Sequence, residues 1–537
     1  MQELKWMVIG LFFVLGSLYV PASAQTRTEV LTGRMEKILK ENPELKHALV
    51  GLEIYSLDED APLYAYNEEK LFGAASTTKL VTEGTALALL GPDYRFHTRV
   101  YRSGAISDGV LKGDLILVAS GDLNISGRVR PDDTLAFENV DHDYADVWPS
   151  DARPVPGDPL LVFQELAGQA AKRGINKIDG RVIVDDTLFH GSAPDGSDVS
   201  PMVVNDNLVD ITIVPDASAG APARLEVLPV TSYVRFLNQV TTGAANSEPA
   251  IERSSDTANP DGTHIVTLSG SIPAGKSPIL FTYNIRKPKR LAEVAFVGAL
   301  QRAGIKVEIS AQQDAPNLKS LSSAYRTENI VAEHVSPPLS EEVKVTLKTS
   351  QNFHAAMMPY ILGALLGPDK PKENSNQAGF TLERNFLEKA GLDVGGTSQS
   401  TGAGGGEADF FSPSFMVHYL AFIKKQKYFE FFKNALPIMG RDGSLWNAPR
   451  EKTKGASVWG KTGDSLTFDS LNQKLVFTGK GLVGYIDTVD GQHLAFAFYF
   501  EHYAFAPTSQ IGSDIDKSGE VFWELIAAAA RPLNAQH

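Results

Sequence analysis

A serine and a lysine stand three residues apart at Ser76 and Lys79, and this S-x-x-K spacing occurs once in the chain. The pattern is helical from about Ser76, and residues three apart lie on one face of a helix, so the hydroxyl and the amine can meet. A serine activated by a neighbouring base is a nucleophile for acyl transfer. Free N–H groups at the first helical turn would also favour an anionic intermediate. Taken alone, the pattern is more often a helix cap followed by a solvated lysine.

The triplet Lys461-Thr462-Gly463 is also unique and precedes a segment typical of a β-strand. A strand can set the Lys461 ammonium and the Thr462 hydroxyl along one edge of a cleft, and Gly463 lets the backbone approach a substrate. Alone, the triplet would be read as a surface turn. The stretch from Gly455 to Thr462 also fits the phosphate-binding pattern G-x-x-x-x-G-K-T. Such a loop needs a helix that starts at its lysine, which the following residues do not predict.

The third element is a weak S-x-N pattern at Ser350 and Asn352. A second copy, at Ser470 and Asn472, follows Lys461 so closely that it belongs to the same predicted hairpin. Ser350 is therefore the better candidate, because it opens a separate helical segment. In isolation it would be a simple helix cap.

The order S-x-x-K, S-x-N, K-T-G is the combination found in penicillin-binding proteins and serine β-lactamases. Beyond the motifs, the chain resembles the S13 peptidase family, the low-molecular-mass class C penicillin-binding proteins, over most of its length. The stretches that carry this resemblance are Phe72–Leu80, Gly113–Asp122, Ile178–Phe189, Ser350–Ala356, Leu436–Leu445 (L-P-x-x-G-x-D-G-[ST]-L) and Gly484–Ile486. A serine β-lactamase fits less well, because a long insertion separates the first two motifs.

The resemblance implies both a fold and a reaction. The expected fold class is α+β: a penicillin-binding, transpeptidase-like domain with an antiparallel sheet flanked by helices, interrupted by β-rich inserted domains. Members cleave D-Ala-D-Ala peptides as carboxypeptidases or open D-amino-acid cross-links as endopeptidases, and penicillins acylate them. The implied partners are peptidoglycan peptides ending in D-Ala-D-Ala and β-lactams. We expect no cofactor and no catalytic metal, since the 11 histidines show no H-E-x-x-H spacing.

The residue types also suggest a mechanism. A serine needs a base, and no G-x-S-x-G elbow or histidine partner is visible, so a lysine must serve. Burial and a second cation both favour the neutral amine of a lysine, and Lys461 could supply that charge beside Lys79. We expect Lys79 to activate Ser76. In the same scheme Ser350 relays a proton to the leaving amine, and Asn352 holds the substrate amide.

The substrate is expected to lie along the strand that carries K-T-G. Thr462 and Gly463 are the first candidate binding residues, and N–H groups of Ser76 and of the strand just after Gly463 would form an oxyanion hole. The resembled family usually has Thr or Ser after K-T-G, whereas this chain has Asp464, which should repel a substrate carboxylate. If Asp464 is a one-residue insertion, Ser465 and Thr467 restore the missing hydroxyls.

The elements that must position these motifs form two blocks. The predicted elements are strands near 48–55 and 62–66, helices at 76–90, 352–366, 381–390 and 414–424, strands at 481–487 and 493–499, and a helix at 520–530. Between the blocks, short strand patterns alternate with glycine-rich and charged turns, and residues 147–159 suggest a surface loop. We expect residues 25–95 and 336–537 to form the transpeptidase-like domain. Residues 96–335 would form one or two inserted β-rich domains, the inner one of two at about 122–202.

Composition limits the location and the partners. Residues 1–24 are typical of a secretory signal, with a basic start, a short apolar run and Ala22-Ser23-Ala24 before Gln25. No later stretch is long and apolar enough for a membrane span, so we expect a periplasmic or otherwise extracytoplasmic protein. The net charge of −14 gives no electrostatic reason to bind nucleic acid, and the chain has no cysteine for a disulfide or a thiol nucleophile. The oligomeric state stays open.

A function of a different class is also compatible with the sequence. A chain with the penicillin-binding fold could be catalytically weak or inactive and act as a cell-wall scaffold. The three motifs argue against this alternative, whereas Asp464 argues for it. Covalent labelling by penicillin distinguishes the two, because only a working nucleophile forms the adduct.

Overall fold

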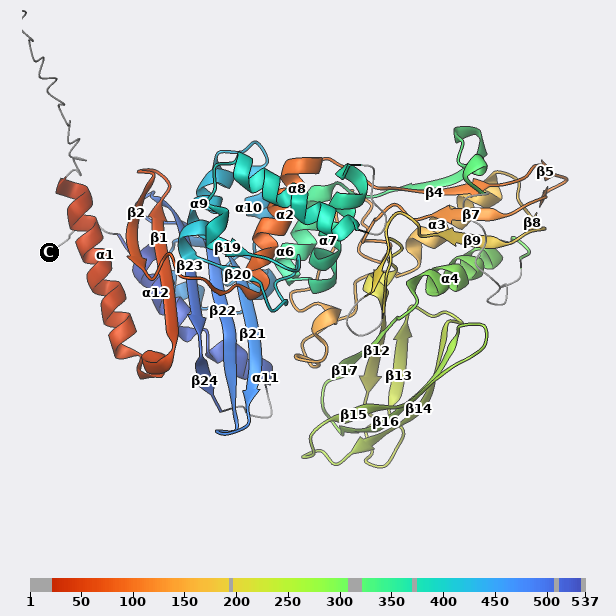
Figure 1. The fold of residues 1–537 in the computed structure, drawn as a ribbon. Helices are drawn as coiled ribbons and strands as arrows, with labels where there is room; N and C mark the ends of the chain where they lie inside the picture. Colours follow the sequence, from red (N-terminus) through yellow and green to blue (C-terminus); the bar gives the residue numbers. More distant parts are fainter. Residues whose placement is uncertain (1–21, 193–196, 308–320, 369–373, 507–510, 533–537) are drawn as a thin grey trace, which may run out of the picture.

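The computed structural model describes residues 22–192, 197–307, 321–368, 374–506 and 511–532. A six-stranded antiparallel sheet, on the left in Figure 1, joins strands from both ends of the chain. In sheet order the strands are β2 (Ala61–Tyr66), β1 (Leu49–Ser56), β23 (His493–Glu501), β22 (Lys474–Asp487) and β21 (Ser457–Asp469), and β24 (Tyr503–Phe505) pairs with β22. Most of the predicted signal segment, residues 1–21, lies outside the described residues.

Both faces of this sheet are buried, as strand β23 shows. Phe496 and Phe498 belong to the core on one face, and Ala497 and Tyr499 belong to the core on the other. Side chains alternate between the two faces of a strand, so a strand covered on both sides reads as a continuous apolar run. This explains the sequence Leu-Ala-Phe-Ala-Phe-Tyr-Phe at 494–500.

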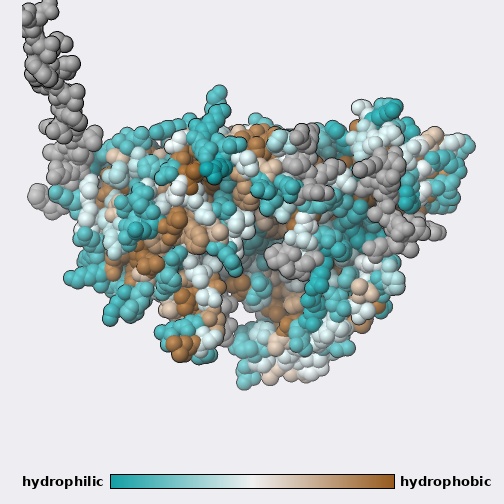
Figure 2. Space-filling view, viewed as in Figure 1, coloured by the Kyte–Doolittle hydropathy of each residue, from teal (hydrophilic) through white to brown (hydrophobic). Residues whose placement is uncertain are grey.

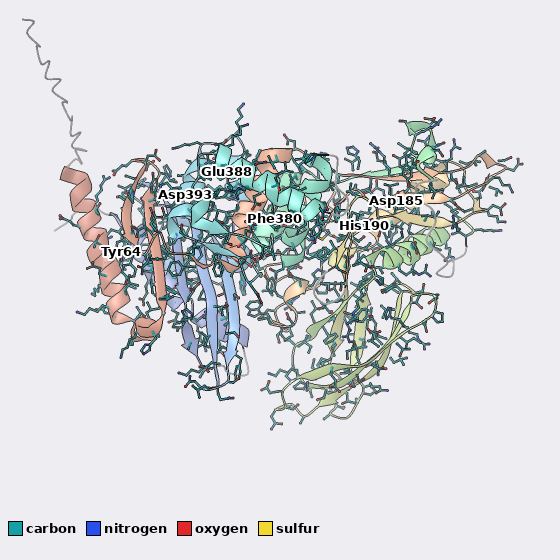
Figure 3. All side chains as sticks on the ribbon, viewed as in Figure 1. Tyr64, Asp185, His190, Phe380, Glu388 and Asp393 are labelled. Carbon is teal, nitrogen blue, oxygen red and sulfur yellow. The ribbon has the colours of Figure 1, made fainter. Side chains whose placement is uncertain are left out.

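Helices cover the sheet in two layers. The outer layer packs on one face and comprises α1 (Ala22–Glu41) and α12 (Glu520–Ala530), with Tyr64 of β2 beside α1 (Figure 3). The inner layer, on the opposite face, holds the motif-bearing segments. Its helices are α2 (Lys79–Leu90), α6 (Leu339–Thr349), α7 (Asn352–Leu366), α8 (Ser375–Lys389), α9 (Pro413–Lys424) and α10 (Phe429–Ala435). The short helix α11 (Ile511–Lys517) precedes α12.

The segment between β4 and β18 contributes a second sheet. Its order is β18 (Ile330–Val335), β4 (His97–Arg102), β7 (Leu115–Val118) and β9 (Val182–Asp185). The helices α3 (Leu161–Lys172) and α4 (Pro288–Arg302) pack against it. Strands β7 and β9 run parallel, and the chain between them includes α3, which is the usual way to connect parallel strands. This part is therefore mixed α/β rather than purely β-rich.

Six further strands form two three-stranded sheets below this layer in Figure 1. They are β12 (Leu208–Val214), β13 (Arg224–Leu228), β14 (Val234–Gly243), β15 (Ala250–Ala258), β16 (His264–Pro273) and β17 (Ile279–Asn284). Because β7 and β9 share a sheet, we propose that an inner module, if separate, spans about 208–284 rather than 122–202. Figure 2 shows a notch between this module and the free end of the β21–β22 hairpin. Phe468 and Leu471, which belong to that end of the hairpin, are exposed.

Short two-residue strands complete the fold. They are β3 (Phe72–Gly73), β19 (Thr397–Ser398) and β20 (Phe410–Phe411) in one sheet, β5 (Ile106–Ser107), β6 (Val110–Leu111) and β8 (Lys177–Ile178) in another, and β10 (Gly191–Ser192) with β11 (Asp198–Val199). Lys461 and Thr462 lie inside strand β21, so no helix begins at Lys461 and the phosphate-loop pattern is excluded. The predicted loop at 147–159 holds no helix or strand, but Ala152 and Val155 are buried, so it is not entirely a surface segment.

Among the residues that the structure describes, no helix combines the length and apolar character needed to cross a bilayer.

Candidate active site

Ser76 lies in a tight 3₁₀ turn, Ala75–Thr78, which leads directly into α2. Ala75 has a φ of +44°, a conformation that a residue with a side chain adopts at an energetic cost. The buried Thr77 hydroxyl fixes the turn by donating to Ala74 O at 2.7 Å, and it contacts Tyr499 Oη at 2.9 Å. The Ser76 side chain is thus presented at the start of a helix by a turn that is held on the sheet.

Lys79 is fully buried and its amine contacts the serine. Its Nζ donates to Ser76 Oγ at 2.6 Å, to Asn352 Oδ1 at 2.8 Å and to Ala403 O at 3.0 Å. Burial lowers the pKa of Lys79 to about 7, although the carboxyl groups of Asp143, Glu83 and Asp409 act in the opposite direction. An amine with this pKa is partly neutral at neutral pH and can take the serine proton.

The S-x-N residues lie where α6 ends and α7 begins. Ser350 has a φ of +63° and ends α6, while Asn352 is the first residue of α7. This left-handed turn directs the Ser350 hydroxyl to Lys461, whose Nζ donates to Ser350 Oγ at 2.8 Å. Asn352 reaches Lys79 through its side-chain oxygen. The structure therefore brings the three motifs together.

Lys461 is the second buried lysine of the site. Its Nζ also donates to Thr462 O at 2.8 Å, and burial, aided by Lys79, holds its pKa well below the ordinary value. Thr462 lines the cleft, where its hydroxyl contacts Ser444 Oγ at 2.9 Å. Ser444 was not among the predicted site residues, although it lies in the L-P-x-x-G-x-D-G-S-L stretch.

Gly463 lies against the turn that carries the serine. A Cβ atom at this position would lie 2.8 Å from Ala74 O and 3.0 Å from Ser76 N, so only glycine permits the approach. Strand β21 is at the edge of its sheet, and Gly460 N–H donates away from β22, to Pro437 O. Backbone directions alternate along a strand, so the Asp464 N–H also points to the free edge. It faces the same side as the Ser76 segment.

The structure does not support an insertion at Asp464. The pairing of β21 with β22 is regular through Asp464 and Lys480, and the irregularity comes only between Ser465 and Leu466. Asp464 lines the cleft and accepts from Lys480 Nζ at 2.6 Å. Ser465 and Thr467 are not among the lining residues, because side chains alternate along the strand. The Ser465 hydroxyl instead accepts from Thr478 Oγ1 at 2.9 Å.

The cleft encloses about 560 Å³ and extends from Ser76 to Trp523. The inserted segment supplies part of its wall, including Tyr144, Trp148 and Asp151. Tyr144 Oη donates to Ser350 O at 2.9 Å and accepts from Asn352 Nδ2 at 3.3 Å. Sequence reasoning missed Tyr144, since a contact between residues so far apart in the chain leaves no local pattern.

Two further features lie close to the site. The glycine-rich segment 402–406 packs against it: Gly404 has a φ of +86° and approaches Ala75. One cluster has metal-ligand geometry, formed by Asp141, His142 and Asp206. The Arg128 guanidinium donates to both of its carboxylates, at 2.8 and 2.7 Å, so a side-chain cation already occupies this position.

The fold is an antiparallel sheet flanked by helices. In the site, Ser76 contacts the buried Lys79, and the hydroxyl of Ser350 contacts the buried Lys461. Together these features define the class of penicillin-binding serine enzymes. Within that class the chain belongs to the D-Ala-D-Ala carboxypeptidase 3 (S13) family, whose sequence model matches residues 31–518. The predicted family and enzyme class are therefore confirmed.

Individual relatives agree with this assignment. The chain is 24% identical over 470 residues to a D-alanyl-D-alanine carboxypeptidase of Actinomadura sp. (strain R39), covering 82% of this chain and 78% of the relative. It is 21% identical over 457 residues to the carboxypeptidase DacB of Haemophilus influenzae, covering 81% and 82%. The crystal structure of penicillin-binding protein 4 from H. influenzae covers 90% of this chain and 98% of its own, with a TM-score of 0.64 and 18% identity. This likeness confirms the predicted fold class.

Proposed function

We propose that the chain is an exported serine peptidase that cleaves D-Ala-D-Ala peptides of peptidoglycan through an acyl-enzyme on Ser76. The observation that carries the proposal is the 2.6 Å contact between Ser76 Oγ and a fully buried Lys79 amine, with a pKa lowered to about 7. A serine hydroxyl next to an amine that is partly neutral at neutral pH is an activated nucleophile.

In the acylation step, neutral Lys79 takes the Ser76 proton while Oγ forms a bond to the carbonyl carbon of the penultimate D-Ala. The negative charge that develops on the carbonyl oxygen is stabilised by the N–H groups of Ser76 and Asp464, which face the cleft edge of β21. These N–H groups are fixed by secondary structure. They therefore need little reorganisation during the reaction.

In the second half of the step, the C–N bond breaks and the leaving nitrogen needs a proton. Ser350 is placed to relay it: the hydroxyl gives its proton to the leaving nitrogen and receives in exchange the proton that Lys79 took from Ser76, passed on through Lys461 Nζ, which lies 2.8 Å from Ser350 Oγ. Asn352 would hold the substrate amide, and its side chain is fixed between Lys79 and Tyr144. Water then hydrolyses the ester. A β-lactam would acylate Ser76 by the same first step, since its amide is opened in the same way.

Asp464 bears on the choice of substrate. A carboxypeptidase must accept the free carboxylate of a terminal D-Ala next to the scissile bond, and a carboxylate on the cleft wall opposes it. Lys480 offsets this effect by pairing with Asp464. We therefore propose that the chain acts on terminal and cross-linked peptides in the periplasm or an equivalent extracytoplasmic compartment. Asp464 is expected to reduce the rate on free termini.

Penicillin labelling followed by product analysis tests the proposal. Purified protein incubated with a fluorescent penicillin should carry one covalent adduct, and Ser76→Ala should carry none. Ser470→Ala is a matched control, because Ser470 lies in the other S-x-N copy on an exposed turn. Incubation with disaccharide-pentapeptide should release D-alanine, and incubation with a cross-linked dimer should release monomers. Absence of the adduct from folded wild-type protein would favour a scaffold without catalysis.

A further inference from the structure

One buried turn of the inserted segment lies next to the S-x-N motif. The turn comprises Asn205, Asp206 and Asn207, and their φ values are +50°, +56° and +57°. Three consecutive left-handed residues without a glycine are unusual, although Asn and Asp tolerate this conformation better than other residues. All three side chains are buried. Strained backbone of this kind persists where the surroundings fix it, and it often serves a site.

The Asp206 carboxylate is the centre of a buried network. Its Oδ2 accepts from Arg128 Nη2 at 2.7 Å, from His142 Nε2 at 2.8 Å and from Gln351 Nε2 at 3.3 Å. Its Oδ1 accepts from His354 Nε2 at 2.9 Å. Two of these four partners, Gln351 and His354, belong to the segment that carries the S-x-N motif.

Gln351 is the middle residue of that motif, and its amide has two contacts. The side-chain oxygen accepts from Phe353 N–H at 2.8 Å and thereby caps α7, the helix that begins with Asn352. The side-chain nitrogen donates to Asp206. Asp206 therefore fixes the orientation of the Gln351 side-chain amide. It thereby also fixes the first turn of α7, the helix that presents Asn352 to Lys79.

The other side of the network holds the loop that covers the motif. His142 begins a short 3₁₀ helix, His142–Tyr144, whose next two residues both touch the S-x-N motif. Asp143 Oδ2 accepts from Asn352 N–H at 3.3 Å, and Tyr144 Oη donates to Ser350 O. One carboxylate thus anchors both the motif and the loop that packs over it.

Both histidines lie between carboxylates. His142 Nδ1 lies 2.8 Å from Asp210 Oδ1, so each of its ring nitrogens faces a carboxylate. An ionised carboxylate only accepts, so both ring nitrogens of His142 must donate. His354 donates from Nε2 to Asp206, and its Nδ1 lies 3.0 Å from Glu342 Oε1 without a hydrogen bond. A buried ionic network is weak evidence for net stability, and its members hold one another in a fixed geometry.

We infer that Asp206 is a positioning residue for the proposed acylation, through which the inserted segment fixes the S-x-N turn and its covering loop against Ser76 and Lys79. The inference rests on the proposed function. It makes the inserted segment part of the catalytic site, because Arg128, His142 and Asp206 all lie between β4 and β18.

The test compares Asp206→Asn with Asp210→Asn in the full-length chain, using the rate of acylation by a fluorescent penicillin. Asp210 is an equally buried carboxylate of the same network, and it accepts from His142 and Asn205 but not from Gln351 or His354. A displacement of about 1 Å at a catalytic group can slow a reaction on the order of a hundredfold. We expect a loss of that size in Asp206→Asn and a several-fold smaller one in Asp210→Asn, at matched fractions of folded protein.

The pH profile separates positioning from a loss of stability. Wild-type acylation should rise with pH through about 7, following Lys79. A loosened S-x-N turn admits water beside Lys79 in Asp206→Asn, so its midpoint should move upward, whereas that of Asp210→Asn should not. Equal losses and unshifted midpoints in both variants would overturn the inference. Absence of acylation in the wild type would instead overturn the proposed function.

If Asp206→Asn does not fold, Gln351→Met replaces it as the probe, since Met keeps the side-chain volume but can neither donate to Asp206 nor accept from Phe353 N–H. Acylation should again fall, with the same upward shift of the midpoint. An unchanged rate in Gln351→Met would overturn the inference. Where all variants fold, the double variant should lose less than the product of the two single losses, because both break one contact.

Discussion

The two ends of the cleft each hold a buried lysine, and the two lysines have different partners. At the inner end Lys79 is fully buried and contacts a hydroxyl, an amide oxygen and a carbonyl. At the outer end Lys480 is 4% exposed and pairs with the Asp464 carboxylate at 2.6 Å. Both lysines have lost most of their water, but only Lys480 has gained a direct ion pair with a carboxylate in return.

The difference shows how one cleft can contain both a base and a structural cation. Burial without an ion pair favours the neutral amine, whereas an adjacent carboxylate favours the charged form. Within the described ranges, neither Lys79 nor Lys461 has a carboxylate within 4.0 Å of its amine. The inner end is therefore suited to proton transfer, and the outer end to fixed charge.

The largest effect is expected from a substitution of the buried lysine at the inner end of the cleft. Lys79→Met removes the proposed base, and a positioned base contributes about 10²–10⁴-fold to a rate. We expect acylation by a fluorescent penicillin to fall by about a thousandfold. Lys480→Met, which removes the paired lysine, should reduce the rate by less than about tenfold, since an ion pair in the cleft wall takes no proton. Similar losses in the two variants would contradict the assignment of roles.

The pH dependence of acylation sharpens the same contrast. In the proposed mechanism neutral Lys79 is the active form, and burial lowers its pKa to about 7, so activity should be lost as pH falls through that value. The neutral fraction changes about tenfold between one unit below and one unit above the pKa, and the rate should change by the same factor between about pH 6 and pH 8. Stopped-flow measurement across this range checks it. A flat profile would exclude Lys79 as the titrating base.

A smaller effect is expected at the outer end. Asp464→Thr removes a negative charge from the path of a terminal carboxylate and leaves Lys480 free to attract it. We expect kcat/KM for a D-Ala-D-Ala pentapeptide to rise about fivefold, as for the loss of one like-charge contact in a partly solvated cleft. An uncharged analogue with an amidated terminus is the matched substrate and should not gain. A gain on both substrates would show that the charge of Asp464 is not responsible.

Much of the inner end could be predicted from the sequence, for a physical reason. The S-x-x-K contact is local, because helical geometry alone brings Ser76 and Lys79 together. The resemblance to a known family supplied the fold class and the expectation that the distant Ser350 and Lys461 share one site with Ser76. In the sheet, strand β23 lies where the apolar run at 493–499 predicted it.

The rest depends on contacts that leave no trace in local patterns. Tyr144 and Asp206 reach the S-x-N motif from the inserted segment, far away in the chain. The α/β character of that segment was also missed, since its short strands gave no sign that β7 and β9 run parallel. Whether the side chain of Asp464 faces the cleft could be settled only by the register of its strand. A shift of one residue would turn every side chain of the strand to the other face.

The smallest expected effect concerns that register. Ser465 contacts Thr478 outside the cleft, and Asp464 occupies the regular position after Gly463, so Ser465→Ala should change acylation by less than about twofold. Ser470→Ala, in the exposed turn of the same hairpin, is the control. If Asp464 were instead an inserted residue, the Ser465 hydroxyl would face the substrate, and its loss would slow the pentapeptide reaction about tenfold without slowing the amidated analogue. A loss on the pentapeptide alone would show that the Ser465 hydroxyl binds the substrate carboxylate. The outer end of the cleft would then lie one residue further along β21.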